Sequence, residues 1–588
     1  MIGYLLIGLV ILLGVTSFAI VWKRHIGLAI PMFFFAIMLY TYGLGLFFPL
    51  SYVCYSALII LAFFVIRAIT LLKSREKDWL FTNIFNSTFL LFGIFMVLFF
   101  LLNVHKAVIY IDEYTHWADV VKGMFQTDHL SIYQDNLWYA SYPPGISLLQ
   151  YFFLTIKGGF QEDVLYMVSQ LFTVSLCLPF LTIKRNAWMQ ILLTGLVLFL
   201  FPTVFFHNYY DQIYVDTLVG ILFAHNMTYL FLHPNLDRYD VSYLTLSATA
   251  LILIKDIGFF FVLLEFIVLL YQIVRYRRSQ LTKGLFIVIM ALSVKLSWSM
   301  ALQIHGVILK HHNMISMAAI GNIITGNGET SQYQIINNFV KLFSSNQIIT
   351  RPISVDYFGV VVILMGLLYW FGNKHYKTGT DRFRYRFIAL TLGIGSFVYV
   401  IGLLGTYLFQ ITWNEAVSMT SYDRYIVIFL NGFFCYLLFL FLHTKKRQEV
   451  FIVVTIGLIL LMPTNYFFLM NFDRYQANYQ AVEQLGQYLK PTDRVLFYVS
   501  HSDNYHYAQV HYYMRPYRIS SEPLDGPATY ITDSTQIYDW SAYQYLYLYQ
   551  TDEVMTEAIV QQFGTTVWEQ QLYQIIDGTK LKVVTDDL

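Results

Sequence analysis

Long apolar stretches alternate with short polar ones along most of this chain. A helix needs about 20 mostly apolar residues to cross the hydrocarbon core of a bilayer, and many of these stretches reach that length. The pattern predicts a polytopic α-helical membrane protein with about fourteen transmembrane helices. The predicted spans are 1–22, 26–48, 52–72, 85–104, 162–183, 187–206, 214–232, 241–254, 257–274, 283–302, 356–372, 387–409, 423–443 and 449–469.

Basic residues indicate which side of this bundle faces the cytoplasm, because Lys and Arg are enriched in cytoplasmic loops. All the basic clusters fall on one side of the predicted threading. Both termini are then predicted outside, together with the loop 105–161, the loop 303–355 and everything after about residue 470. The clusters that set this orientation are 23–24, 73–77, 184–185, 275–278, 374–386 and 445–447.

The apolar segment 143–159 is not predicted to cross the membrane. A crossing would place the basic pair 184–185 outside, against the rest of the pattern. We instead expect a helix that lies along the outer leaflet. Pro144 suits its first turn, and the glycine pair 158–159 suits its end.

The helices 241–254 and 257–274 are short for a full span and meet at Lys255 and Asp256. Short helices that meet at polar residues often line a cavity instead of facing lipid. A simpler alternative is that Lys255 and Asp256 neutralise each other.

The character of the chain changes after about residue 470, where Tyr becomes abundant and strand-like segments appear. A helix over 477–489 and strands near 494–500, 528–532 and 543–549 predict a small extracytoplasmic α/β domain. The predicted parts are 1–84 (additional N-terminal membrane helices), 85–470 (membrane catalytic domain with loops 105–161 and 303–355) and 471–588 (α/β domain).

The amino-acid composition narrows the class of protein. The chain is 57% hydrophobic and 12% charged, whereas soluble domains carry about 25% charged residues. The net charge of +1 and the lack of a basic tail speak against nucleic acid as a partner. No Cys or His spacing suggests a metal, and no motif suggests a cofactor. The first 22 residues read as a retained helix and not as a cleaved signal peptide.

The sequence Asp112-Glu113-Tyr114-Thr115-His116-Trp117 follows a predicted span and opens the first external loop. Asp112 can cap a helix that begins near Glu113, which places His116 one turn away on the same side. The plain alternative is an amphipathic loop helix whose acids face solvent. Asp112 and Glu113 are catalytic candidates, although Glu113 also fits a supporting role, and His116 is a candidate substrate contact.

Three further charges are predicted at the same outer edge. Asp216 lies in the first turn of the predicted span 214–232, where we expect it to face a polar cavity. The alternative is that the helix dipole simply favours an acid at this position. Lys255 suits an anionic head group. Arg424, whose planar donor fork suits phosphate, and Tyr422, two residues before it, are candidate substrate contacts; a local charge cluster of Arg424 with Asp423 is the alternative.

Arg351 is a weaker candidate for phosphate, at the end of the loop 303–355. The adjacent His311 and His312 are interpreted as ordinary loop residues. Carboxylates and cations gathered at one interface suit a lipid-linked phosphate leaving group and an acceptor hydroxyl that needs a base. No glycine-rich phosphate loop is present, which argues against a soluble nucleotide donor.

The order of these motifs resembles the GT-C superfamily of integral-membrane glycosyltransferases, in particular the protein mannosyltransferase and aminoarabinose-transferase types. The matching elements are the acidic pair at 112–113, the Pro pair at 143–144, Asp216, Lys255 with Gly258, and the segment 422–425. Three additional N-terminal helices and Ser141-Tyr142, where relatives often carry a lysine, depart from that pattern.

The resemblance implies transfer of a sugar from a polyprenyl-phosphate carrier to an acceptor on the outer face, usually without a metal. It implies that Asp112 is the catalytic base, that Asp216 supports it, and that Lys255 and Arg424 hold the donor phosphate. We expect a bacterial plasma-membrane enzyme acting on a cell-surface glycan or teichoic-acid-type acceptor. A lipid-linked oligosaccharide flippase or transporter, and a polysaccharide polymerase or ligase, are the alternatives.

Overall fold

The computed structural model divides the chain into two compact units. The helical unit comprises Met1–Val104, Asp128–Tyr133 and Ser141–Asn471. The α/β unit comprises His105–Thr127, Gln134–Ala140 and Phe472–Leu588, so that much of the loop 105–161 is grouped with the C-terminal region. All residues are described except 1, 74, 135–136, 182, 184–187, 308–316, 351, 378, 445–447, 462–484, 486–487, 491, 501–503, 516–518, 521–527, 534, 536–538 and 585–588.

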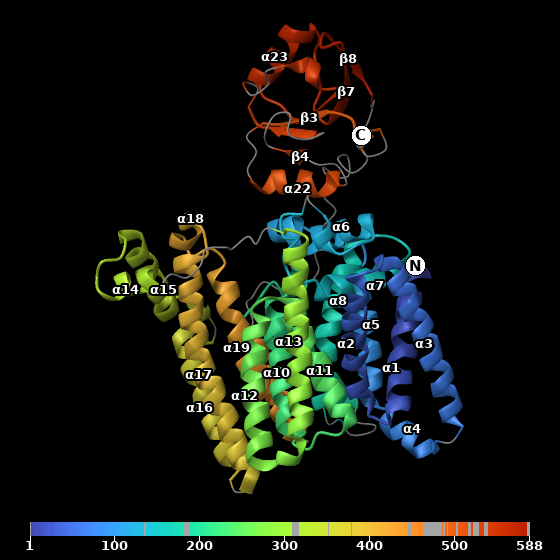
Figure 1. Cartoon of the computed structure of the whole chain (residues 1–588), viewed down its shortest axis with the longest axis vertical. Coiled ribbons are helices and arrows are strands. Elements are labelled where there is room, and N and C mark those ends of the chain that lie inside the picture. Colours follow the sequence, from blue (N-terminus) through green and yellow to red (C-terminus); the bar gives the residue numbers. More distant parts are fainter. Residues whose placement is uncertain are drawn as a thin grey trace. The chain divides into compact units, whose positions relative to one another are not determined.

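Each of the predicted spans forms a helix in the helical unit (Figure 1). These helices are α1 (Ile2–Trp22), α2 (Ile26–Gly45), α3 (Leu50–Leu72), α5 (Ser87–Asn103), α8 (Glu162–Ser175), α9 (Trp188–Leu200), α10 (Asp216–Leu232), α11 (Arg238–Ile254), α12 (Gly258–Tyr276), α13 (Leu281–Ile304), α16 (Tyr357–His375), α17 (Gly379–Phe409), α19 (Tyr422–Thr444) and α20 (Gln448–Leu461).

Shorter elements connect these helices. They are α4 (Lys77–Asn83), α7 (Gly145–Lys157), α14 (Met317–Ile324), α15 (Thr330–Ser345), α18 (Trp413–Val417), the antiparallel strands β1 (Gln347–Ile349) and β2 (Val355–Asp356), and the 3₁₀ turns Ser131–Tyr133, Leu178–Phe180, Phe201–Thr203, Tyr209–Asp211 and Arg278–Gln280.

Within the described residues, nine helices are long and apolar enough to cross a membrane, or ten if the bent pair α4 and α5 forms one span. The expected number of about fourteen is therefore not reached by full-length spans. The difference lies in α9, α10, α11 and α20, which are helical as predicted but have 13, 17, 17 and 14 residues. The chain is a polytopic helical membrane protein in which several helices fall short of a complete span.

The surface of α3 shows what surrounds the helical unit. Only four of its 23 residues are buried, yet its exposed side chains include Ile59, Phe63 and Ile66. A helix that is apolar all round and exposed on most of its surface suits hydrocarbon and not water.

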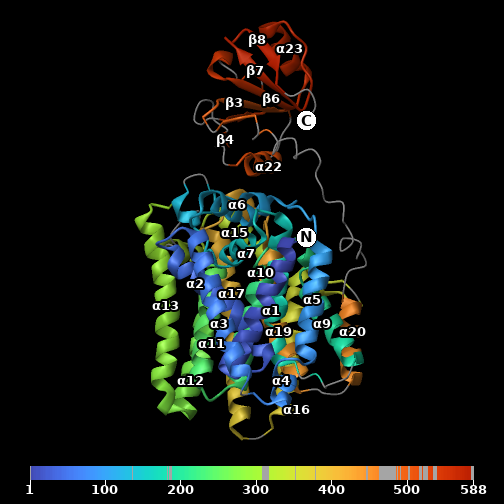
Figure 2. The same ribbon diagram turned by 90° about the vertical axis from the view of Figure 1, so that its right-hand side faces the viewer.

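Within the helical unit drawn in Figure 2, α10 packs chiefly on α19 and also on α12 and α11. Nearly all of its side chains are buried. It packs closely on α19 because Gly220 has no side chain: a Cβ there would lie 2.3 Å from the carbonyl oxygen of Ile428. Asp216 lies one turn before Gly220 and Arg424 one turn before Ile428, so this close contact also sets the spacing of the two charges.

The helix predicted to lie along the membrane surface is α7, and its environment differs from that prediction. All residues from Gly145 to Leu154 are buried, and α7 packs against α1, α2, α8 and α11. Pro144 occupies the position before the first turn, while Gly158 ends the helix with φ = 87°, which glycine adopts without strain. The helix exists as predicted but is enclosed by its neighbours.

The α/β unit contains a six-stranded sheet with the order β4-β5-β3-β6-β7-β8. The first four strands of this order are parallel, and β7 and β8 extend the sheet antiparallel. The strands predicted near 494–500, 528–532 and 543–549 are confirmed as β3, β5 and β6. The predicted helix 477–489 lies mostly outside the described residues. The strands are β3 (Val495–Val499), β4 (Ile519–Ser520), β5 (Ala528–Ile531), β6 (Tyr545–Gln550), β7 (Gln571–Ile576) and β8 (Lys580–Val583).

Both faces of this sheet are covered by helices. Alternate residues of β3 contribute to two separate cores. Phe497 shares one core with Val510 and Met514 of α22 (Asn504–Met514). Leu496 shares the other with residues of α23 (Glu553–Phe563). The short turn Trp540–Ala542, a π-helical turn over Glu113–Trp117 and α6 (Ala118–Thr127) complete the unit.

The close approach of α10 and α19 gives a test of the helical packing. Gly220→Ala should lower the stability of the protein by about 1–3 kcal/mol, because the new methyl group overpacks the contact with Ile428. The thermal unfolding midpoint in detergent measures this change. Gly366→Ala in α16 is the matched control, since a Cβ there meets nothing within 4 Å. Equal midpoints for the two variants would contradict the packing described.

Candidate functional site

Asp216 and Lys255 form an ion pair in the helical unit. Asp216 is the first residue of α10, and Lys255 follows the last residue of α11. The Lys255 Nζ donates to Oδ1 of Asp216 at 2.6 Å. The Asp216 side chain is 1% exposed and that of Lys255 is 15% exposed. The break between the short helix α11 and the full-length helix α12 thus places a lysine against a buried acid.

Arg424 brings a second cation to the same carboxylate. It lies in the first turn of α19, and its Nε is 3.6 Å from Oδ2 of Asp216. Its guanidinium also lies over the rings of Tyr214 and Tyr425, at 4.8 and 5.3 Å from their centroids. One carboxylate and two cations give this cluster a formal charge of +1, which favours an anionic ligand.

The two local charge pairings considered above do not form. Asp256 pairs with Lys295 of α13 at 2.8 Å instead of with Lys255. Asp423 accepts hydrogen bonds from Tyr357 and Asn346, whereas Arg424 approaches Asp216. In both cases neighbouring residues of opposite charge have different partners, because they project from different sides of the chain.

A cavity of about 460 Å³ opens beside this cluster. Its polar lining includes Lys255, Asp256, Gln410, Tyr425 and Tyr142, and Tyr142 comes from the segment just before the Pro pair. The rest of the lining is mostly apolar, with Phe260 of α12, Val398 and Leu403 of α17, Ile411 just after α17, and Ile428 of α19. Charged groups beside mostly apolar side chains suit an amphiphilic ligand.

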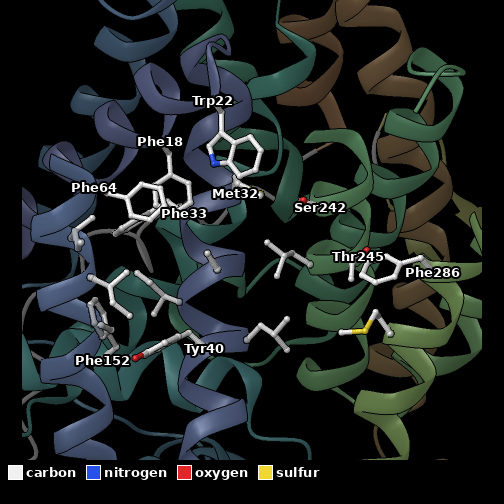
Figure 3. Close-up of a pocket in the computed structure, with 18 residues that line it drawn as sticks. Phe18, Trp22, Met32, Phe33, Tyr40, Phe64, Phe152, Ser242, Thr245 and Phe286 are labelled. Carbon is white, nitrogen blue, oxygen red and sulfur yellow. The ribbon is translucent and has the colours of Figure 1, made fainter. Parts of the chain in front are cut away.

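A second cavity, of about 440 Å³, lies between the N-terminal helices α1, α2 and α3 and the helices α11 and α13 (Figure 3). Its lining includes Phe18, Phe33, Phe64 and Phe152, with Ser242 and Thr245 as polar groups. None of its lining residues is charged. It offers hydrocarbon contacts but nothing that would stabilise a phosphate.

The acidic loop motif belongs to the α/β unit. Asp112 is partly exposed and precedes a π-helical turn, Glu113–Trp117, in which the Ala118 N–H bonds to the Glu113 carbonyl. Asp112 is at the predicted cap position, but its side chain makes no capping hydrogen bond. The wider winding of a π-turn also alters the expected one-turn relation between Asp112 and His116.

Glu113 and His116 are both buried in the α/β unit. The Glu113 carboxylate accepts hydrogen bonds from the backbone N–H groups of Ile109 and Tyr110, at 2.9 and 3.1 Å. The His116 ring stacks on Trp117 and on Tyr139, with centroid distances of 4.0 and 4.4 Å. Glu113 therefore holds the backbone that leads into Asp112.

The remaining candidate residues lie apart from the cavity or outside the described residues. Tyr422 is 2% exposed and packs on Phe339 and Tyr357, whereas Tyr425 lines the cavity. Arg351 and the pair 311–312 lie outside the described residues. In the described part of the chain, no group of three or more His, Cys, Asp or Glu side chains could hold a metal ion.

The sequence reading missed a buried ion pair in the α/β unit. Asp119 of α6 and Arg515, just after α22, are joined by two hydrogen bonds, one of them 2.7 Å from Arg515 Nη2 to Asp119 Oδ2. Their side chains are 0% and 1% exposed. Asp119 lies on the polar face of α6 with Lys122 and Gln126, so its spacing gave no sign of burial, and nothing in the sequence linked it to a residue 396 positions away.

His511 of α22 is a further buried group of the α/β unit. Trp138 stacks on its ring with a centroid distance of 4.7 Å. Burial lowers the pKa of His511 to about 4, against the opposing effect of Asp119, so the ring is neutral at neutral pH. Its contribution is packing against the aromatic side chain of the loop.

No protein-family model matches the chain, and neither does any curated protein. Among solved structures the chain is similar to ArnT from Cupriavidus metallidurans bound to undecaprenyl phosphate, with 12% sequence identity and a TM-score of 0.37. The match covers 84% of this chain and 97% of that one. A likeness this distant does not assign the chain to a family, so its function has to be argued from its own side chains.

The pairing of Lys255 with Asp216 predicts a stability effect. Lys255→Met leaves the buried Asp216 without its hydrogen-bonded cation and should cost about 3 kcal/mol, since breaking a buried ion pair is strongly destabilising. Lys295→Met, which removes the more exposed pair with Asp256, should cost less than about 1 kcal/mol. Thermal unfolding in detergent compares the two variants, and a larger loss for Lys295→Met would refute the assignment.

Proposed function

We propose that this chain is a membrane glycosyltransferase that moves a sugar from a polyprenyl-phosphate carrier to a cell-surface glycan or teichoic-acid-type acceptor. The observation that carries the proposal is the cluster of Asp216, Lys255 and Arg424, with its charge of +1, beside a largely apolar cavity. A lipid phosphate has the complementary properties, because it joins an anion to a hydrocarbon chain.

The cluster has hydrogen-bonding capacity left for a phosphate. An ammonium group has three donors, and Lys255 uses one of them on Asp216. Lys255 also lines the cavity, so its remaining donors are available to a ligand there. Arg424 adds a fixed cation behind it. The buried Asp216 holds both cations in place and offsets part of their mutual repulsion.

The proposed reaction is a displacement at the anomeric carbon of the carrier-bound sugar. The acceptor hydroxyl forms a new C–O bond while the bond from that carbon to the carrier phosphate breaks. Lys255 and Arg424 stabilise the negative charge that develops on the leaving phosphate. Asp112 takes the hydroxyl proton as general base. We locate this reaction on the outer face of a bacterial plasma membrane; the distribution of basic residues supports the outer face.

The resemblance of the motifs to the GT-C superfamily supports the same proposal. Asp112 with Glu113, the Pro pair at 143–144, Asp216 and Lys255 occur in the order typical of that group. A flippase would move the intact lipid-linked sugar without releasing the carrier. A polymerase or ligase relying on Arg351 and the His pair would be independent of Lys255 and Arg424.

The base is tested by replacing Asp112 with Asn, which keeps the shape of the side chain but cannot accept the proton. We expect Asp112→Asn to lower the release of polyprenyl phosphate from a labelled polyprenyl-phosphate sugar by about 100-fold or more, within the range attributed to general base catalysis. Glu415→Gln, at an exposed acid near the start of α19, is the control and should retain activity. A fully active Asp112→Asn enzyme would refute the role of Asp112.

The phosphate-binding role is tested separately with Lys255→Met and Arg424→Met. Each variant loses a hydrogen bond to a charged group, worth about 1.5–3 kcal/mol, so the donor KM or Kd should rise by about 10- to 150-fold. Titration of the donor at a saturating acceptor concentration measures this change. Transport of intact lipid without carrier release would instead support the flippase, and unchanged donor affinity in both variants would contradict the proposed phosphate site.

A further inference from the structure

The loop segment that carries Asp112 is held by the C-terminal helix α22 on both sides of the acid. Before Asp112, the Tyr505 hydroxyl donates to the carbonyl oxygen of Ile109 at 2.7 Å. After it, the Gln509 amide donates to the Tyr114 hydroxyl at 3.0 Å. All of these residues belong to the α/β unit.

The Tyr114 hydroxyl also links the two sides of Asp112 to each other. It donates in turn to the carbonyl oxygen of Val108 at 2.6 Å, and its ring is fully buried. Together with the hydrogen bonds that the Ile109 and Tyr110 N–H groups donate to the Glu113 carboxylate, this closes the backbone into a compact turn around Asp112. The turn continues into the π-helical segment, a winding that often occurs at functional sites.

After Asp112 in the chain, one face of α6 contacts the end of α22 through an ion pair and two further hydrogen bonds. Asp119, Lys122 and Gln126 have the spacing of one helical face. Asp119 forms the two hydrogen bonds with Arg515, Lys122 donates to the Tyr512 carbonyl at 3.0 Å, and Gln126 donates to the Arg515 carbonyl at 3.1 Å. A buried bidentate pair tolerates little displacement of either partner.

We propose that the Asp119–Arg515 ion pair positions Asp112 for catalysis, so that α22 acts as the element that sets the geometry of the base. Arg515 is then a positioning residue that acts through Asp112 and does not touch the donor. This inference rests on the proposed function. It explains why an external loop and a C-terminal domain, distant in sequence, form one compact unit.

Turnover measurements on the full-length protein test the role in catalysis. Arg515→Met should lower kcat for carrier release by about 30-fold or more while changing the donor KM less than twofold. Arg494→Met, at an exposed arginine of the same unit, is the matched control and should leave both values unchanged. An Arg515→Met enzyme with normal kcat would overturn the proposal.

A double-mutant cycle separates positioning from a general loss of structure. If Arg515 acts only through Asp112, adding Arg515→Met to Asp112→Asn should lower kcat less than threefold further. Losses that multiply as independent effects would overturn the proposal. A second control combines Asp119→Leu with Arg515→Met and so replaces the ion pair by apolar side chains. This double variant should keep the α/β unit folded while removing both charges. In that variant kcat should stay below that of the wild type, and full recovery would show that the charges do not position the base.

A labelling experiment tests the ion pair without any enzyme activity, so that it stays informative if the proposed function fails. Thr115 is buried in the π-helical turn, and the three native cysteines are buried. A cysteine in a Thr115→Cys variant should react slowly with maleimide when Arg515 is present and at least tenfold faster with Arg515→Met. Equal labelling rates with and without Arg515 would overturn the proposed positioning. If labelling becomes faster as expected but the wild-type protein releases no carrier, only the glycosyltransferase function is refuted.

Discussion

The helical unit depends on one buried carboxylate held between two cations. Asp216 is 1% exposed, and a charge so deeply buried is stable only with a close partner of opposite sign. That partner reaches it only because α11 ends early at Lys255 and because Gly220 lets α10 approach α19, which brings Arg424 near. The short helices and the close packing are therefore requirements of the charge cluster.

The two units contribute different chemistry to the proposed reaction. The helical unit offers the cations and the cavity that suit a lipid-linked phosphate. The α/β unit carries Asp112 and surrounds it with contacts from α22. The N-terminal helices α1, α2 and α3, by contrast, line part of a cavity without charged residues and contribute no residue to either set.

Much of the helical architecture could be predicted from the sequence, because a membrane-spanning helix is a local property of an apolar stretch. The ends of these helices were harder to predict, because α10 begins at Asp216 and α11 ends just before Lys255, where the two charges pair, and composition alone does not reveal such a pairing. Adjacency in the sequence also could not show whether Lys255 pairs with Asp256 or with Asp216. The Asp119–Arg515 pair was missed entirely, because its partners lie in distant segments that meet only in the folded α/β unit.

The central claim is that the cluster at Asp216 recognises the phosphate of a lipid carrier, and equilibrium binding of two lipids tests it most directly. Undecaprenyl phosphate and the uncharged alcohol undecaprenol have the same hydrocarbon chain, so their Kd values differ only through the phosphate. We predict that the purified protein binds the phosphate at least about 100-fold more tightly, a difference of about 2.7 kcal/mol. This preference should largely disappear when Lys255 and Arg424 are both replaced by Met. Equal affinities of the wild-type protein for the two lipids would contradict the account.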